Sequence, residues 1–293
     1  MPFPFLALAI SAAFSFVGQL LLPKPKGAKP VNDLRFPTAT EDRPIPVIWG
    51  QVRQDAPNVL WYGDFSTSPI RQRVGLFSKT TVGYQYRANF NLAIGYGPDV
   101  RITQILIDDK VAWGGYVGRG QISINSPMLF GDDTRGGFIA NIDVYDGSYT
   151  QQISPYLSSR LPWGVPAYRG VAHLVFTGLP WGAAYIGNDA EIKPIKIVAQ
   201  RYPSALAGGQ YSNISGDANP IECLYELLIN PDWGMGLDPT LFDTASWTAA
   251  AQTLYNEGLG FSALWDKSED LTTTIDMFQR FVNGVVVYNS QTG

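Results

Sequence analysis

Residues 165–182 place the strongest constraint on the fold, because a short apolar run is bounded on both sides by glycine and proline. The run itself, residues 171–176, contains only apolar residues apart from His173. A run of this length between turn residues is typical of a mostly buried β-strand. Arg169 directly precedes it, and an arginine in this position is expected to hold neighbouring carbonyl groups or a carboxylate.

Short β-like runs separated by turns continue through the first two thirds of the chain. The chain contains 30 Gly and 21 Pro, many of them between these runs. This punctuation predicts a β-rich body with many turns. The predicted strands cover residues 45–49, 58–64, 90–95, 102–107, 111–113, 122–124, 138–145, 171–176 and 192–199.

The pattern becomes helical after residue 219. Asn219 is a good N-cap, Pro220 suits a first helical turn, and Gly258 is a suitable helix terminator. One helix is predicted to start at the N-cap Asn219, and two others are predicted at residues 244–257 and 269–281. A strand is predicted to begin at residue 285. Residues 202–218 are polar and rich in Gly and Ser, which favours a linker.

The predicted fold class is therefore α+β and mainly β. Residues 31–201 form a β-rich domain, residues 202–218 a linker, and residues 219–293 a smaller α+β domain whose last strand lacks a partner. From that strand we expect the chain to be incomplete at its C-terminus. Residues 1–30 form an apolar helix followed by a Pro/Lys linker.

Residues 3–22 allow three interpretations because they are almost wholly apolar. A helix of about 20 residues would reach roughly 30 Å, which is enough to cross a bilayer core. A signal peptide is disfavoured because no Lys or Arg precedes the apolar run. A membrane anchor and a helix that packs against other subunits both remain open; Ala, Ser and Gly permit the close approach that the second needs.

Composition limits the chemistry that one chain can perform. The net charge is -4, so no basic field predicts nucleic-acid binding through phosphates. Any Ser-His-Asp or zinc chemistry would have to pass through the single histidine, His173, which is expected to be structural. The single cysteine, Cys223, is expected to pack against the apolar face of a helix. No catalytic residue, cofactor or metal site is predicted.

Aromatic residues suggest a different role, in contacts. The chain has 8 Trp and 15 Tyr, and most lie inside strand or helix patterns, where use in a core is expected. Trp181 and Trp233 lie in Gly-rich turns and are better candidates for contact with another subunit. The full set of candidate interface or structural residues is Trp49, Trp61, Tyr168, Arg169, Trp181 and Trp233.

Several separate motifs, in the right order, resemble one protein family. Residues 166–170 (Pro-Ala-Tyr-Arg-Gly) precede an apolar strand and a Leu-Pro turn, as they do in siphophage tail-tip central hub proteins. That family includes the lambda-type tail-tip attachment protein and the large tail protein of gene transfer agents. An earlier motif matches at Asp33, Leu34, Arg35, Pro44, Pro46, Gly50, Val52, Arg53, Asn58 and Trp61.

The resemblance implies a non-enzymatic protein built as a homotrimer at the distal tip of a tail in the virion. It implies a tail-tube-like β-barrel in the first domain. The implied partners are the distal tail protein ring, the tape-measure protein C-terminus, other tail-tip and receptor-binding proteins, and the host membrane if the N-terminal helix enters it. Such a hub closes the tail tube, organises the attachment proteins and opens for DNA delivery.

Two other classes of function stay open from the sequence alone. A tail-associated glycan or peptidoglycan hydrolase would need two carboxylates in a cleft with aromatic walls, and no such pair is recognisable. A membrane-anchored bacterial envelope protein is favoured only by residues 3–22. A peptidoglycan-release assay tests the first class, and cell fractionation tests the second.

Overall fold

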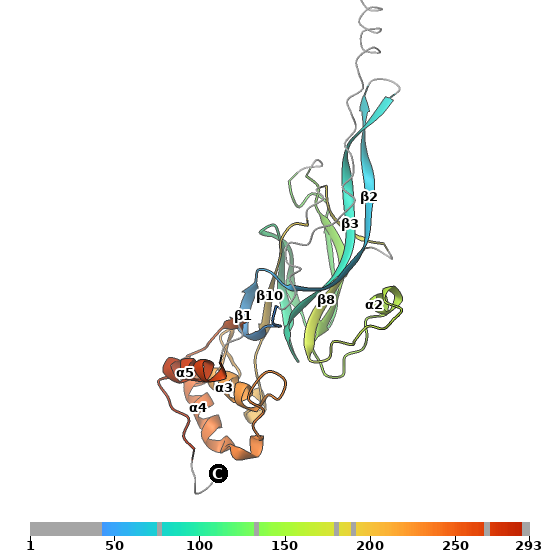
Figure 1. Cartoon of the computed structure of the whole chain (residues 1–293). Helices are drawn as coiled ribbons and strands as arrows, with labels where there is room; N and C mark the ends of the chain where they lie inside the picture. The colour runs from blue at the N-terminus through green and yellow to red at the C-terminus, as the bar shows by residue number, and fades with distance from the viewer. Residues whose placement is uncertain are drawn as a thin grey trace, which may run out of the picture.

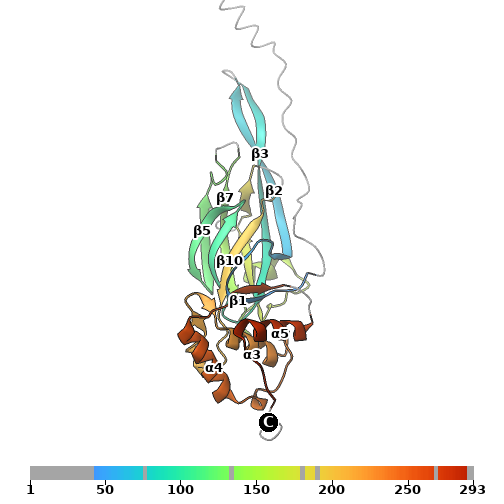
Figure 2. The ribbon, with the colours of Figure 1, turned by 90° about the vertical axis from the view of Figure 1, so that its left-hand side faces the viewer.

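The molecule is long and narrow, with a β-ribbon at one end and a group of helices at the other (Figures 1 and 2). The computed structural model describes residues 43–74, 78–131, 135–178, 182–188, 192–266 and 270–288. The predicted apolar helix at residues 3–22 lies outside the described residues. Within the described parts of the chain, no helix combines the length and the apolar composition that crossing a bilayer requires.

Two antiparallel sheets form the β-rich body. The five-stranded sheet has the order β13 (Ala263–Trp265), β1 (Val47–Gln54), β10 (Ile195–Arg201), β4 (Arg101–Ile107) and β5 (Lys110–Val117). The six-stranded sheet has the order β2 (Asn58–Val74), β3 (Ser78–Tyr96), β8 (Val171–Thr177), β7 (Phe138–Asp146) and β6 (Gly120–Ser126), with β9 (Ala184–Gly187) paired to β3 and β7.

The main core lies between these sheets and is built from the alternating residues that face inward on each strand. Phe90 and Phe176 stack at a ring-centroid distance of 4.4 Å on the six-stranded sheet. The five-stranded sheet contributes buried Ile48, Ile105 and Ile197. The prediction of a mainly β fold is confirmed. The pairings among the described strands leave the two sheets separate and do not close them into the barrel that the family resemblance implies.

The helical unit (residues 202–288) follows the sequence signals closely. Helix α3 (Pro220–Ile229) begins where the Asn219 side chain accepts a hydrogen bond from the Ile221 backbone N–H at 3.0 Å. Helix α4 (Thr244–Glu257) ends at Gly258, which adopts the left-handed conformation that glycine tolerates. Helix α5 (Leu271–Val282) completes the group, and a six-residue helix, α2 (Pro155–Arg160), lies in the β-rich body.

The segment predicted as a linker is instead folded into the helical unit. Residues 202–218 contain a 3₁₀ turn (Ala207–Gly209) and the hairpin of β11 (Asn213–Ile214) and β12 (Asp217–Ala218). Leu206 and Ile214 are buried with Tyr225 and Leu254. The Gly/Ser-rich composition hides this order, because Leu206 and Ile214 are the only large apolar side chains buried in this segment. A second 3₁₀ turn (Pro239–Leu241) precedes α4.

Strand β1 joins the β-rich body to the helical unit because both of its faces are buried. Ile48 points into the core between the sheets, whereas Val47 and Trp49 point into a second core with helix α3 and helix α5. Trp49 stacks on Trp265 with centroids 5.9 Å apart and meets Phe278 edge-on at 5.3 Å. The smaller domain is therefore continuous with the five-stranded sheet through β13.

A buried ion pair crosses the same junction. The Arg201 guanidinium of β10 pairs with the Glu226 carboxylate of α3, and their side chains are only 4% and 13% exposed. The Trp49 Nε1–H donates to Glu226 Oε2 at 3.3 Å, and the Arg201 Nε–H donates to the Pro98 carbonyl at 3.0 Å. These bonds satisfy both charged groups, which a buried pair requires.

Arg201→Ala should lower the free energy of unfolding by about 3–5 kcal/mol, because it leaves the Glu226 carboxylate buried without its partner. Arg53→Ala is the matched control: Arg53 pairs with Asp55 on the surface, where both are more than half exposed, and its loss should cost less than about 1 kcal/mol. Urea unfolding followed by tryptophan fluorescence measures both variants. Equal losses would show that the junction does not depend on the ion pair.

Candidate assembly surfaces

The hairpin of β2 and β3 extends well beyond the body (Figure 1). Residues 68–74 pair with residues 78–85, and neither run pairs with any other described strand. We call residues 68–85 the ribbon. Over its whole 17-residue length, β2 pairs with β3 alone among the described strands, so it is the outermost described strand of the six-stranded sheet.

A strap of residues 148–170 covers the outer face of the six-stranded sheet and carries α2. Leu157 and Val165 of the strap are buried against Val175 of β8, with Trp61 and Tyr168 packed around them. Two of the candidate residues, Trp61 and Tyr168, therefore hold the strap to the sheet.

A polar network fixes the same strap to the ribbon's base. Asp64 accepts hydrogen bonds from the Tyr156 hydroxyl at 2.5 Å and from Asn89 Nδ2 at 3.1 Å. Arg160, at the end of α2, forms an ion pair with Asp64 at 3.0 Å. Asn89 also accepts from the Ala184 backbone N–H at 2.8 Å. Asp64 of β2 therefore holds the strap to the sheet through its bonds to Tyr156 and Arg160.

His173 is buried beneath this strap and behaves as the sequence predicts. Its Nδ1 lies 2.9 Å from Asn91 Oδ1, and its ring stacks on Tyr145 with centroids 4.3 Å apart. Burial lowers the pKa of His173 to about 4, so the imidazole is neutral near pH 7. Among the described residues, no group of three His, Cys, Asp or Glu side chains is placed to hold a metal ion.

The other candidate residues divide between the inside and the surface. Trp49 is fully buried, and Trp233 packs on it at 6.2 Å, so both contribute to the junction within one chain. Arg169 is exposed, and no described residue pairs with it, which differs from the bonded role expected for it. Trp181 lies outside the described residues.

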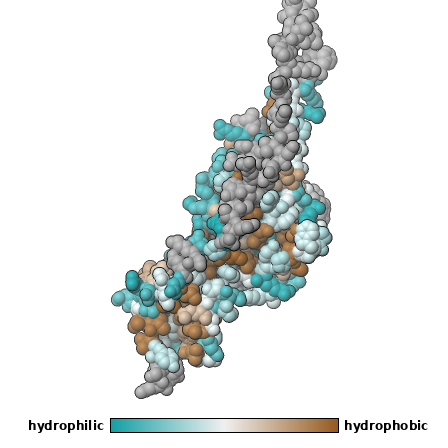
Figure 3. Space-filling model, in the orientation of Figure 1, coloured by the Kyte–Doolittle hydropathy of each residue, from teal (hydrophilic) through white to brown (hydrophobic). Residues whose placement is uncertain are grey.

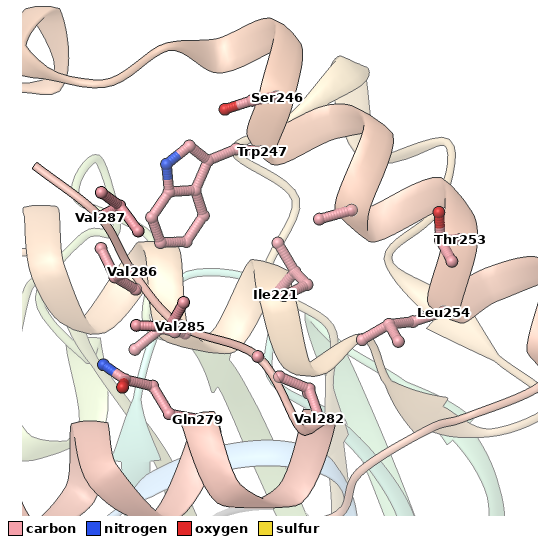
Figure 4. A pocket seen from close by; sticks show the side chains of 13 residues that line it. Ile221, Ser246, Trp247, Thr253, Leu254, Gln279, Val282, Val285, Val286 and Val287 are labelled. Carbon is pink, nitrogen blue, oxygen red and sulfur yellow. The ribbon is translucent and has the colours of Figure 1, made fainter. Parts of the chain in front are cut away.

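An apolar groove lies in the helical unit between α3, α4 and the segment that follows α5 (Figure 4). Its volume is about 530 Å³, and its walls include Ile221, Trp247, Leu254 and Val286. Residues 284–288 run extended along it without a strand partner among the described residues, so the strand predicted there does not form in this structure. Brown, hydrophobic surface covers part of this end of the molecule (Figure 3).

Val285 and Val287, on either side of Val286, also line this groove and are 73% and 74% exposed (Figure 4). Exposed apolar side chains in a row are a feature of surfaces that bind other molecules.

Among the described residues, Glu222 is the carboxyl group whose pKa burial raises close to neutral. Burial raises the pKa of Glu222 to about 7, and the charge of Glu226 adds to this shift, while hydrogen bonds from the backbones of Leu206 and Ala205 oppose it. Its side chain is fully buried in α3 and faces the Leu206 N–H at 3.0 Å. Through this hydrogen bond, Glu222 links α3 to the segment of residues 202–218.

No protein-family model matches the chain, and no curated protein matches it. Among solved structures, a chain from "Virion of native gene transfer agent (GTA) particle" is similar to it with a TM-score of 0.39 and 16% sequence identity. The similarity covers 96% of this chain and 60% of that chain, so the present chain spans less than two thirds of its neighbour's length.

Glu222→Gln should flatten the dependence of the free energy of unfolding on pH between about pH 4.3 and about pH 7. In the wild type the folded pKa is raised, so the stabilising contribution of Glu222 is fully present below the unfolded pKa. It is lost as the pH rises through the folded pKa of about 7. Urea unfolding at several pH values measures this. Glu257→Gln, at an exposed site, should keep the wild-type slope; parallel curves for all three proteins would contradict the assignment.

Proposed function

We propose that this chain is a structural subunit of a phage tail tip and forms the trimeric central hub that closes the distal end of the tail tube. The observation that carries the proposal is the ribbon, in which β2 and β3 pair only with each other among the described strands. A two-stranded hairpin is marginally stable in water by itself, and an outermost strand invites pairing with another chain. Both features favour a subunit that is completed by its neighbours.

The structure explains why two residues of the hub-like motifs, Gly50 and Asn58, are needed at their positions. Gly50 lies in the left-handed region with φ 68°, and a Cβ there would meet Ser262 Oγ at 2.0 Å, so β13 can lie beside β1 only if residue 50 is glycine. Asn58 donates to the carbonyls of Arg43 and Pro44 at 3.2 and 3.1 Å, which fixes the entry to β1. The motifs thus mark the scaffold that the ribbon and the helical unit extend from.

The role we propose is mechanical. Subunits arranged around an axis close the tube lumen, contact the distal tail ring and the end of the tape-measure protein, and support the receptor-binding proteins. Opening for DNA delivery then requires movement between subunits, while each subunit stays rigid through β1 and the Arg201–Glu226 pair. Interfaces between subunits, and not a chemical step, would carry the function.

The chain should sediment as a trimer at micromolar concentration, because strand pairing and apolar burial at the exposed edges favour closed association. Analytical ultracentrifugation of the purified protein measures the mass directly. A variant in which a two-residue turn replaces residues 70–83 keeps the body and should shift the equilibrium toward monomer. A wild-type protein that stays monomeric and well behaved at these concentrations would contradict the proposal.

A further inference from the structure

The ribbon carries positive charge on one face. Arg71, Arg73 and Lys79 are all exposed, and no Asp or Glu occurs between residues 68 and 85. The strand register sets Arg73 directly opposite Lys79, and Arg71 opposite Thr81. Directly opposed residues, and residues two apart on one strand, point to the same side of a sheet. All three cations therefore lie on one face of the ribbon.

The ribbon has no third described strand to support it. Like charges placed directly opposite each other, as Arg73 and Lys79 are, do not favour strand pairing. A carboxylate-bearing surface against this face would complement the positive charge of Arg71 and Lys79 and would cover the ribbon at the same time.

The opposite end of the molecule supplies such a surface. Residues 202–293 contain 11 acidic and 2 basic residues, a formal charge of -9, although the whole chain carries only -4. Eight of these carboxylates are exposed in the described residues: Asp217, Asp232, Asp238, Asp243, Glu257, Asp266, Asp270 and Asp276. Figures 1 and 2 show the ribbon and the helical unit at opposite ends of the long axis. Within one chain, the two charged ends do not meet.

We propose that the cationic face of the ribbon docks on the acidic helical unit of a second copy of this chain. The inference rests on the proposed function and specifies how its subunits join. Because each copy offers one cationic and one acidic end, the contact is head-to-tail, and such a heterologous contact makes a ring when the rotation closes. Charge complementarity of this kind fixes the register and the choice of partner.

Not all of the exposed carboxylates are equally free to make this contact. Asp238, Asp243 and Asp270 cap helices or turns. Glu257, at the end of α4, and Asp276, in α5, cap no helix or turn among the described residues, so they are the residues to exchange in a test.

The test is sedimentation of the full chain with exchanged charges. Arg71→Glu/Lys79→Glu should raise the dissociation constant of the oligomer by about tenfold or more. The dissociation constant of the wild type should also rise when the NaCl concentration is increased from about 50 mM to about 500 mM. Adding Glu257→Lys/Asp276→Lys to the first variant should restore association. Lys110→Glu/Arg119→Glu makes the same change in net charge outside the ribbon and should leave the constant near that of the wild type. Circular dichroism checks that each variant is folded.

Two outcomes would overturn the inference while leaving the proposed function intact. In one, Arg71→Glu/Lys79→Glu forms trimers as strongly as the wild type at every salt concentration. In the other, that variant loses only its binding to a short DNA duplex, which would assign the ribbon to phosphate contacts. A wild-type monomer under all conditions would instead contradict the proposed function itself.

Discussion

The molecule depends on a single strand whose two faces are buried in different cores. Ile48 of β1 belongs to the core between the sheets, and its neighbours Val47 and Trp49 belong to the core of the helical unit. Strand alternation makes this possible, because adjacent side chains point to opposite faces. The buried Arg201–Glu226 ion pair also connects β10, which lies beside β1, to helix α3. Burial on both faces of β1 and this ion pair therefore join the body to the helical unit.

Several segments lie outside the two cores that β1 joins. The ribbon is at one end of the long axis (Figure 1), and β2 pairs with β3 alone among the described strands. In the helical unit, Val285 and Val287 are 73% and 74% exposed. Outermost strands and rows of exposed apolar side chains are features of surfaces that bind other chains. In the role that we propose, neighbouring subunits would cover these segments.

The sequence predicted the parts of the fold in which local signals and burial agree. The strands at residues 102–107, 138–145 and 171–176 are short apolar runs between turn residues. Helix α3 starts after its expected N-cap, Asn219, and α4 ends at its expected terminator, Gly258. The ribbon was not predicted, because its Ser, Thr, Gln and Arg residues show no apolar alternation and it pairs only with itself. Trp49 and Trp233 were recognised as contact residues, but composition cannot tell a contact within one chain from a contact between chains. The exposure of Val285 and Val287 likewise depends on the path of the chain after α5.

Hydrogen–deuterium exchange at the ribbon tests the central claim most directly. Amide exchange in residues 68–74 and 78–85 is compared between dilute, dissociated chains and the assembled oligomer. If neighbours complete the subunit, these amides exchange fast in the dissociated chain and become strongly protected on assembly, while the amides of β8 are protected in both states. Equal protection of the ribbon in both states would show that it needs no neighbour, and would contradict the account.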